Sequence, residues 1–179
     1  MEYKPTQCIS TGQNQGDMRF IIEQSGSPLL IVIGLNPSTA NENQPDQTMK
    51  KVVRFAEISD YQGFAMINLY PQRHTYVSDL PSTPDNDVIK QNLLHIKELG
   101  RRYPNADVLV AYGNDCCIRD YLFSSLKDIV KNLETNNGRK YYVIGKLTKA
   151  GHPRHPLYAK YEWNLEPFDI KTYLDKMMF

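Results

Sequence analysis

The short segment Gly34–Ala40 places a polar side chain, Asn36, between residues that shape the backbone. The amide of Asn36 offers two donors and one acceptor, and Pro37 beside it stiffens the chain. Gly34 comes directly after an apolar run and allows a sharp turn close to a ligand. An asparagine fixed in this way can position a water molecule or a ligand. The alternative is an ordinary strand-to-loop turn built from common turn residues.

The Gly34–Ala40 segment does not match the common nucleotide-binding and hydrolase motifs. It is neither GxGxxG nor GxxxxGK[ST], and it lacks the GxSxG pattern. A Rossmann dinucleotide site, a Walker-type NTPase and an α/β-hydrolase therefore lose their usual support in the sequence.

A second candidate stretch begins at Asn68 and continues through Tyr70 to Arg73. An asparagine inside an apolar strand must find hydrogen-bond partners when it is buried. It either cross-links backbone groups or binds the edge of a ligand. The connection that follows runs to about Pro84 without clear periodicity, and loops of that length are often functional.

The third stretch, Gly145–Tyr158, is the richest in polar side chains and contains no acid. Each of its two prolines stands beside a histidine and restricts the backbone there, as an active-site loop requires. A solvated basic loop is the alternative. Zinc is not expected, because no carboxylate ligand lies near the histidines in the sequence. The basic and imidazole residues of this stretch are Lys146, Lys149, His152, Arg154 and His155.

The secondary structure around the three candidate stretches is expected to determine their positions. Short apolar runs alternate with helical patterns along the chain. This alternation predicts an α/β fold with a parallel sheet and helices on both faces, in which ligands bind beyond the carboxyl ends of the strands. An earlier run, Arg19–Glu23, is predicted to be an edge strand. The central strands are predicted at Leu29–Ile33, Phe64–Leu69, Asp107–Tyr112 and Tyr141–Ile144.

Apolar residues at helical spacing predict four helices. Asp46 is a candidate N-cap for the first helix, and Asp85 or Asn86 for the second. The third is expected to end near the turn signal Asn136-Asn137-Gly138. The apolar positions fall within Met49–Ala56, Ile89–Gly100, Ile118–Ile129 and Ile170–Met177.

Composition is that of an ordinary globular protein: 41% hydrophobic residues and a net charge of +1 over 179 residues. We expect a single domain spanning residues 1–179. The near-neutral charge argues against a strongly basic nucleic-acid-binding protein. No apolar run approaches the length of a membrane span, no secretory signal precedes the domain, and a cytoplasmic location is expected. Three cysteines without CxxC spacing suggest inert thiols, with no metal and no cofactor.

Four strings together resemble a known family: GLNPSTA (Gly34–Ala40), NLYPQR (Asn68–Arg73), VAYG (Val110–Gly113) and LTKAGHPRHPLY (Leu147–Tyr158). They are similar to an uncharacterised bacterial and phage family, the domain-of-unknown-function 1643 family. The similarity spans most of the chain. That family has no established activity, so the resemblance names no function.

The order of elements also resembles, more distantly, the uracil-DNA glycosylase superfamily. This resemblance implies a three-layer α/β/α sandwich with a short, mainly parallel central sheet. It implies that Asn36 positions the attacking water, Asn68 reads the edge of the base, and His155 stabilises the departing base. Ser38 departs from the glycine of the mismatch-specific motif, and no Pro-Phe pair follows the first motif. The stacking aromatic is therefore unassigned, with Tyr70 and Tyr158 as candidates.

These considerations lead to a glycosylase-like protein that hydrolyses an N-glycosidic bond or binds a nucleobase. An imidazole aimed at a base oxygen stabilises the anion that forms as the base departs. The expected loops carry no paired carboxylates, which disfavours a two-acid glycoside hydrolase mechanism. Asn36 and His155 are the expected catalytic residues. Expected substrate contacts are Gly34, Leu35, Pro37, Ser38, Asn68, Tyr70, Arg73, His152 and Arg154, and Lys146 and Lys149 are expected to bind phosphate.

The sequence is also compatible with two other functions. A non-catalytic module could bind a nucleotide or single-stranded nucleic acid in the same crevice. An enzyme acting on a free nucleoside or small metabolite is the third possibility. DNA or a nucleotide is the expected partner in the first two cases.

Overall fold

A computed structural model describes residues 1–134 and 138–177, and seven strands within these ranges form one mixed sheet. The strand order is β1-β2-β4-β3-β5-β6-β7. β4, β3, β5 and β6 run parallel to one another, whereas β1, β2 and β7 join through antiparallel pairs. The strands are β1 (Gln7–Ser10), β2 (Arg19–Gln24), β3 (Leu29–Gly34), β4 (Gly63–Asn68), β5 (Asp107–Val110), β6 (Tyr141–Ile144) and β7 (Leu165–Pro167).

The sheet differs in two ways from the sequence-based expectation. It is neither short nor mainly parallel, because three of its six strand pairs are antiparallel. Arg19–Gln24 is not an edge strand, because Gln7–Ser10 pairs along its outer side. The short sequences of β1 (QCIS) and β7 (LEP) lack the apolar runs from which the other strands were predicted.

Four α-helices follow the predicted apolar patterns in the described chain, except that Ile118 of the third pattern lies in the preceding 3-10 helix Asn114–Ile118 and is exposed. α1 begins after Asp46, whose carboxylate accepts from the Met49 amide, and α2 begins after Asp85, which caps it in the same way. α3 ends at Leu133, and the predicted turn residues Asn136 and Asn137 lie outside the described residues. The helices are α1 (Gln47–Ile58), α2 (Asn86–Arg102), α3 (Tyr121–Leu133) and α4 (Ile170–Lys176).

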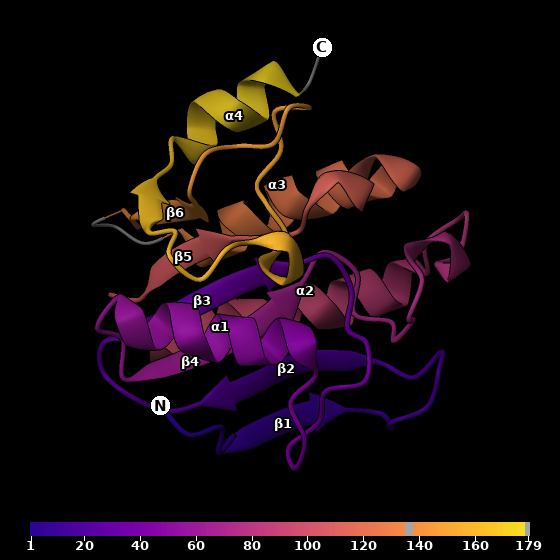
Figure 1. Cartoon of the computed structure of the whole chain (residues 1–179). Coiled ribbons are helices and arrows are strands. Elements are labelled where there is room, and N and C mark those ends of the chain that lie inside the picture. The colour runs from indigo at the N-terminus through magenta and orange to yellow at the C-terminus, as the bar shows by residue number, and fades with distance from the viewer. Residues whose placement is uncertain (135–137, 178–179) are drawn as a thin grey trace.

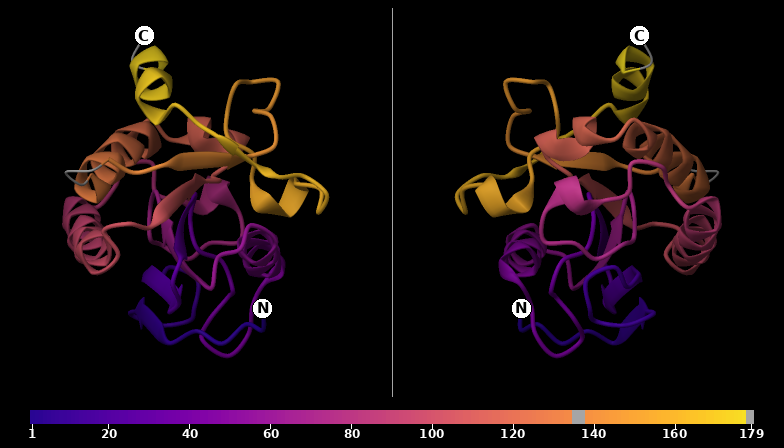
Figure 2. Two further views of the ribbon diagram at one scale, coloured as in Figure 1. Left: turned by 90° about the vertical axis from the view of Figure 1, so that its left-hand side faces the viewer. Right: turned by 90° about the vertical axis from the view of Figure 1, so that its right-hand side faces the viewer.

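Helices cover both faces of the sheet, as Figures 1 and 2 show: α1 lies on one side, and α2 and α3 lie on the other. Successive residues of β3 point to opposite faces, so this buried strand contributes to two cores. Ile31 and Ile33 pack in the cluster that includes apolar residues of α2 and α3. Leu30 and Val32 pack in the cluster formed with α1. This arrangement confirms the α/β class.

The parallel register brings the carboxyl ends of the central strands to one edge of the sheet. Gly34 of β3 lies opposite Asn68 of β4, and Ile33 lies opposite Val110 of β5. The loops that follow β3, β4, β5 and β6 are therefore neighbours. Among the described residues, no helix is long and apolar enough to cross a membrane.

Candidate functional site

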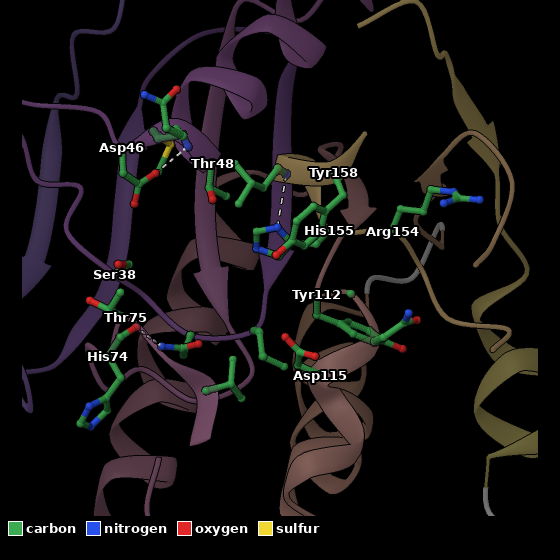
Figure 3. A pocket seen from close by; sticks show the side chains of 18 of the residues that line it. Ser38, Asp46, Thr48, His74, Thr75, Tyr112, Asp115, Arg154, His155 and Tyr158 are labelled. Atoms are coloured by element: carbon green, nitrogen blue, oxygen red, sulfur yellow. Dashed lines mark hydrogen bonds between the residues drawn. The ribbon is translucent and has the colours of Figure 1, made fainter. Parts of the chain in front are cut away.

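A cavity of about 590 Å³ lies at this edge of the sheet, and the loops after all four parallel strands line it. Its volume is in the range of small-molecule sites. Figure 3 shows Ser38 and Asp46 on one side of the cavity and His155 and Tyr158 on the other. The loop residues that line it include Leu35, Asn36, Ser38, Asp46, His74, Thr75, Val77, Tyr112, Gly113, Asn114, Asp115, Thr148, Arg154, His155, Leu157 and Tyr158.

The amide of Asn36 is held in one orientation by two backbone carbonyls. Its Nδ2 donates to the oxygen of Pro37 at 3.0 Å and to that of His74 at 2.9 Å. Both amide hydrogens are thereby used. The Oδ1 atom accepts no hydrogen bond from the described residues, so a fixed acceptor remains at the cavity wall.

His155 lies at the N-cap of a 3-10 helix, Pro156–Tyr158, and its Nδ1 accepts from the Leu157 amide at 3.3 Å. Burial lowers the pKa of His155, and the Asp115 and Asp46 carboxylates partly oppose this effect. The imidazole is therefore neutral near pH 7. Because Nδ1 is the acceptor, the ring proton is assigned to Nε2, which is then a hydrogen-bond donor.

Gly113 allows His155 to pack close to the end of β5. Its φ is +82°, and a Cβ atom built there would lie 2.9 Å from the Cβ of His155. Its amide also donates to the Pro153 carbonyl at 3.1 Å. Only glycine satisfies both requirements without strain, so this position fixes the distance between the two loops.

Two carboxylates that were not predicted to belong to the site also line the cavity. The Asp46 carboxylate stabilises the start of α1 and the loop before it, because it accepts hydrogen bonds from the amides of Met49 and Ala40. Asp115 is exposed and makes no hydrogen bond or ion pair with the described residues. In the sequence, Asp115 lies two residues after Gly113 and just beyond a predicted strand. This position could have indicated that Asp115 belongs to the site.

The two aromatic candidates for stacking differ in their surroundings. Tyr158 lines the cavity, is 76% exposed, and lies with its ring centroid 5.9 Å from that of His155. Tyr70 is buried, packs against Tyr121, and accepts through its hydroxyl from the Asp85 amide. The structure therefore places Tyr158 at the cavity and Tyr70 in the core.

The basic residues of the Gly145–Tyr158 stretch do not point into the cavity. Arg154 lines the cavity, but its guanidinium donates to the carbonyls of Lys146 and Leu147 and lies 4.8 Å from the Trp163 ring centroid. In Figure 3 it points away from His155. Lys146 and Lys149 are exposed and lie outside the cavity lining.

Two buried arginines lie beneath the loop after β3. Arg73 does not line the cavity; it donates to the carbonyls of Gly12, Ser38 and Ala40. Arg19 lines the cavity and donates to the Ala40 carbonyl. Burial and the neighbouring Arg73 lower the pKa of Arg19 to about 10. Positive charge therefore lies under the cavity in a poorly solvated position.

The remaining predicted site residues lie behind the cavity lining. Gly34 and Pro37 are buried. Asn68 is fully buried on the same strand face as Met66, which lines the cavity, and neither polar atom of its side chain has a hydrogen-bond partner among the described residues. His152 is also buried, and its ring contacts Cys117 and Tyr173 instead of the cavity.

The fold and the cavity define a mixed α/β protein with a ligand-sized site at the carboxyl ends of its parallel strands. The chain belongs to the family described as protein of unknown function (DUF1643), whose model matches residues 19–157. The match includes the loops after β3, β4 and β5 and the loop after β6 as far as Leu157, so of the cavity lining only Tyr158 lies beyond it. Neither the curated proteins nor the solved structures show a match to the chain.

Proposed function

We propose that the cavity binds a nucleobase with its sugar and hydrolyses the N-glycosidic bond between them, in the manner of a uracil-DNA-glycosylase-like protein. One observation carries the proposal: Asn36 and His155, from distant parts of the chain, line the same cavity with complementary hydrogen-bonding groups. Asn36 presents a fixed acceptor, and the neutral His155 presents a donor.

These two groups suit the two charges that develop in the reaction. The Oδ1 of Asn36 accepts a hydrogen from a water molecule and holds its oxygen toward the sugar. The C1′–N bond breaks, its electron pair leaves with the base, and the water oxygen bonds to C1′. The proton that this water loses passes through solvent to the departing base, so the products are the free base and a sugar with a C1′ hydroxyl. The Nε2–H of His155 donates to an oxygen of the departing base. One such preorganised donor lowers a barrier by roughly 3–4 kcal/mol.

Other residues of the cavity fit the same substrate. The Asp115 carboxylate, which forms no ion pair with a described residue, stabilises the positive charge on the sugar by Coulomb attraction. The exposed ring of Tyr158 offers a stacking surface for the base. Beneath the cavity, Arg19 favours a substrate that carries a phosphate. These features support a nucleotide unit over an uncharged metabolite.

Base release from defined substrates tests this function. The full chain is incubated with uracil-containing and mismatch-containing oligonucleotides, single-stranded and duplex, and with free nucleosides and nucleotides. Strand breaks after alkali and chromatography of the released base report turnover. We expect Asn36→Ala and His155→Gln to lower the rate by about 100-fold or more. Tyr158→Ala should raise KM, and Tyr158→Phe should restore it.

Matched control variants lie outside the cavity. Asn105→Ala changes an exposed asparagine, and His95→Gln changes the histidine of α2 that packs against Phe20. Both should retain the wild-type rate. Wild type indistinguishable from Asn36→Ala on every substrate would overturn hydrolysis. Salt-sensitive binding without turnover would instead identify a nucleic-acid-binding module. Turnover of free nucleosides alone would identify a nucleoside hydrolase.

A further inference from the structure

Cys116, Cys117 and His152 bring three metal-ligating atoms together outside the cavity. The Cys117 Sγ lies 3.9 Å from the Cys116 Sγ and 3.3 Å from the His152 Nε2. All three ligand atoms lie within 4.8 Å of one another. The two cysteines belong to the 3-10 helix Asn114–Ile118 after β5, and the histidine belongs to the loop after β6.

These separations correspond to the edges of a tetrahedral zinc site. With Zn–S bonds of about 2.3 Å and Zn–N bonds of about 2.0–2.1 Å, a tetrahedron places two sulfurs about 3.8 Å apart and sulfur and nitrogen about 3.6 Å apart. The Sγ–Sγ distance of 3.9 Å and the Cys117 Sγ–His152 Nε2 distance of 3.3 Å each lie within about 0.3 Å of these values. Rotation of the side chains must bring the third pair, Cys116 Sγ and His152 Nε2, from within 4.8 Å to the same range. We propose that Cys116, Cys117 and His152 bind a zinc ion.

The orientation of His152 supports this assignment. Its Nδ1 lies 2.9 Å from the Tyr173 hydroxyl, and this hydroxyl lies 2.6 Å from that of Tyr112. A metal-binding histidine characteristically uses its second ring nitrogen in such a hydrogen bond. The pair of tyrosines therefore holds the ring so that Nε2 faces the sulfurs.

Three protein ligands leave one position of the tetrahedron for water or another exchangeable group. Cys117 is exposed, whereas Cys116 and His152 are buried. The open position therefore faces solvent on the Cys117 side. A bound zinc ion would cross-link the loop after β5 to the loop after β6. These loops carry Asp115 and His155, which line the cavity.

This site was not expected from the sequence, which suggested inert thiols and no metal. The two cysteines are adjacent and His152 lies 35 positions after Cys117, so no compact zinc motif exists. The parallel pairing of β5 with β6 brings the two segments together in the fold. The proposal does not depend on base hydrolysis, since metal binding is measured directly.

Metal titration of the reduced full chain tests the site. Co²⁺ serves as a spectroscopic probe, because a cobalt–thiolate site gives an intense charge-transfer absorption band. Zn²⁺ should then displace Co²⁺ at one ion per chain. We expect Cys116→Ser, Cys117→Ser and His152→Gln each to weaken Zn²⁺ binding by about 100-fold or more, and Tyr173→Phe by about 10-fold.

Cys8→Ser is the matched control, because Cys8 is the remaining free cysteine and lies in β1. It should bind Co²⁺ and Zn²⁺ like wild type. Cys117 is exposed, so its serine variant is expected to fold, and circular dichroism checks this. Zn²⁺ should raise the Tm of wild type but not of Cys117→Ser. Absence of binding, binding without a thiolate band, or binding lost equally in Cys8→Ser would overturn the proposal.

Discussion

Arg19 and Arg73 donate to the same acceptor, the carbonyl oxygen of Ala40, at 3.0 and 2.9 Å. Both side chains are buried, and no described carboxylate is hydrogen-bonded to either guanidinium. The two cations instead fix backbone carbonyls of the loop after β3, the loop that carries Asn36. The position of the candidate catalytic amide thus depends on two arginines from β2 and from the loop after β4.

Replacing Arg73 should therefore loosen this loop. Arg73 donates to three carbonyls, and a lysine ammonium in its place cannot reach all of them with the same geometry. We expect Arg73→Lys to lower the free energy of unfolding by about 2–4 kcal/mol, measured by urea denaturation. Arg101→Lys, at an exposed position of α2, is the control and should change it by less than about 0.5 kcal/mol. Equal effects of the two variants would contradict this role.

Replacing Asn68 by an apolar residue should stabilise the fold. Its buried amide has no hydrogen-bond partner among the described residues, and such a group costs roughly 1–3 kcal/mol. Asn68→Leu should therefore raise the free energy of unfolding by about 1–2 kcal/mol, measured by urea denaturation.

Asn92 provides the contrasting variant. Its Nδ2 donates to the Asn68 carbonyl at 3.0 Å, so Asn92→Leu removes a partner from a buried acceptor. We expect this variant to lose about 1–3 kcal/mol of unfolding free energy. If Asn68→Leu destabilised the protein by the same amount, the cost assigned to the unsatisfied Asn68 amide would be wrong.

Gly34 leaves no room for a side chain beneath the cavity. A Cβ atom there would lie 2.6 Å from the Met66 Cε and 2.9 Å from the Asn68 Oδ1. Met66 can move but Asn68 is enclosed, so Gly34→Ala should cost about 1–3 kcal/mol in thermal or urea unfolding. Gly100→Ala, in α2, meets its nearest neighbours at 3.4 Å and should change stability by at most about 1 kcal/mol.

The lowered pKa of His155 makes stability depend on pH. The unfolded state has the ordinary value near 6.5, so between that value and the lower folded pKa the unfolded state binds more protons. The free energy of unfolding should fall as the pH decreases through this window and be unaffected by this group above it. Asp115 and Asp46 oppose the shift, and Arg19 and Arg154 line the same cavity.

Urea denaturation at a series of pH values measures this dependence. His155→Gln cannot titrate, so its stability should decline less on acidification than that of wild type. His95→Gln, at a position outside the cavity, should keep the wild-type slope. Parallel curves for His155→Gln and wild type would contradict the assignment of a neutral imidazole with a lowered pKa.

The central fold could be predicted because its strands are continuous apolar runs and its helices have clear apolar faces. Leu29–Gly34 is buried along its whole length, as its composition indicates. β1 and β7 could not be found in this way, because their short sequences pair at the sheet edges and contribute few buried side chains. Their antiparallel pairing is decided by tertiary contacts.

The candidate site could be predicted where it depends on strand order alone. The carboxyl ends of parallel strands meet at one edge, so Asn36 and His155 were expected to approach one another there. Side-chain hydrogen bonds decided the rest: Tyr70 and Arg73 turn into the interior, and Arg154 folds back on its own loop. No local pattern in the sequence specifies those contacts.

The antiparallel strand β1 precedes residue 19, where the match to the family model begins. It saturates the backbone groups along one side of β2, whose residues Phe20, Ile21 and Ile22 are buried. A chain that begins at Arg19 would expose one hydrogen-bonding side of the apolar strand β2. Such an open strand edge is a template for pairing with a second molecule. We therefore expect a chain that lacks the first eighteen residues to self-associate more readily than the full chain.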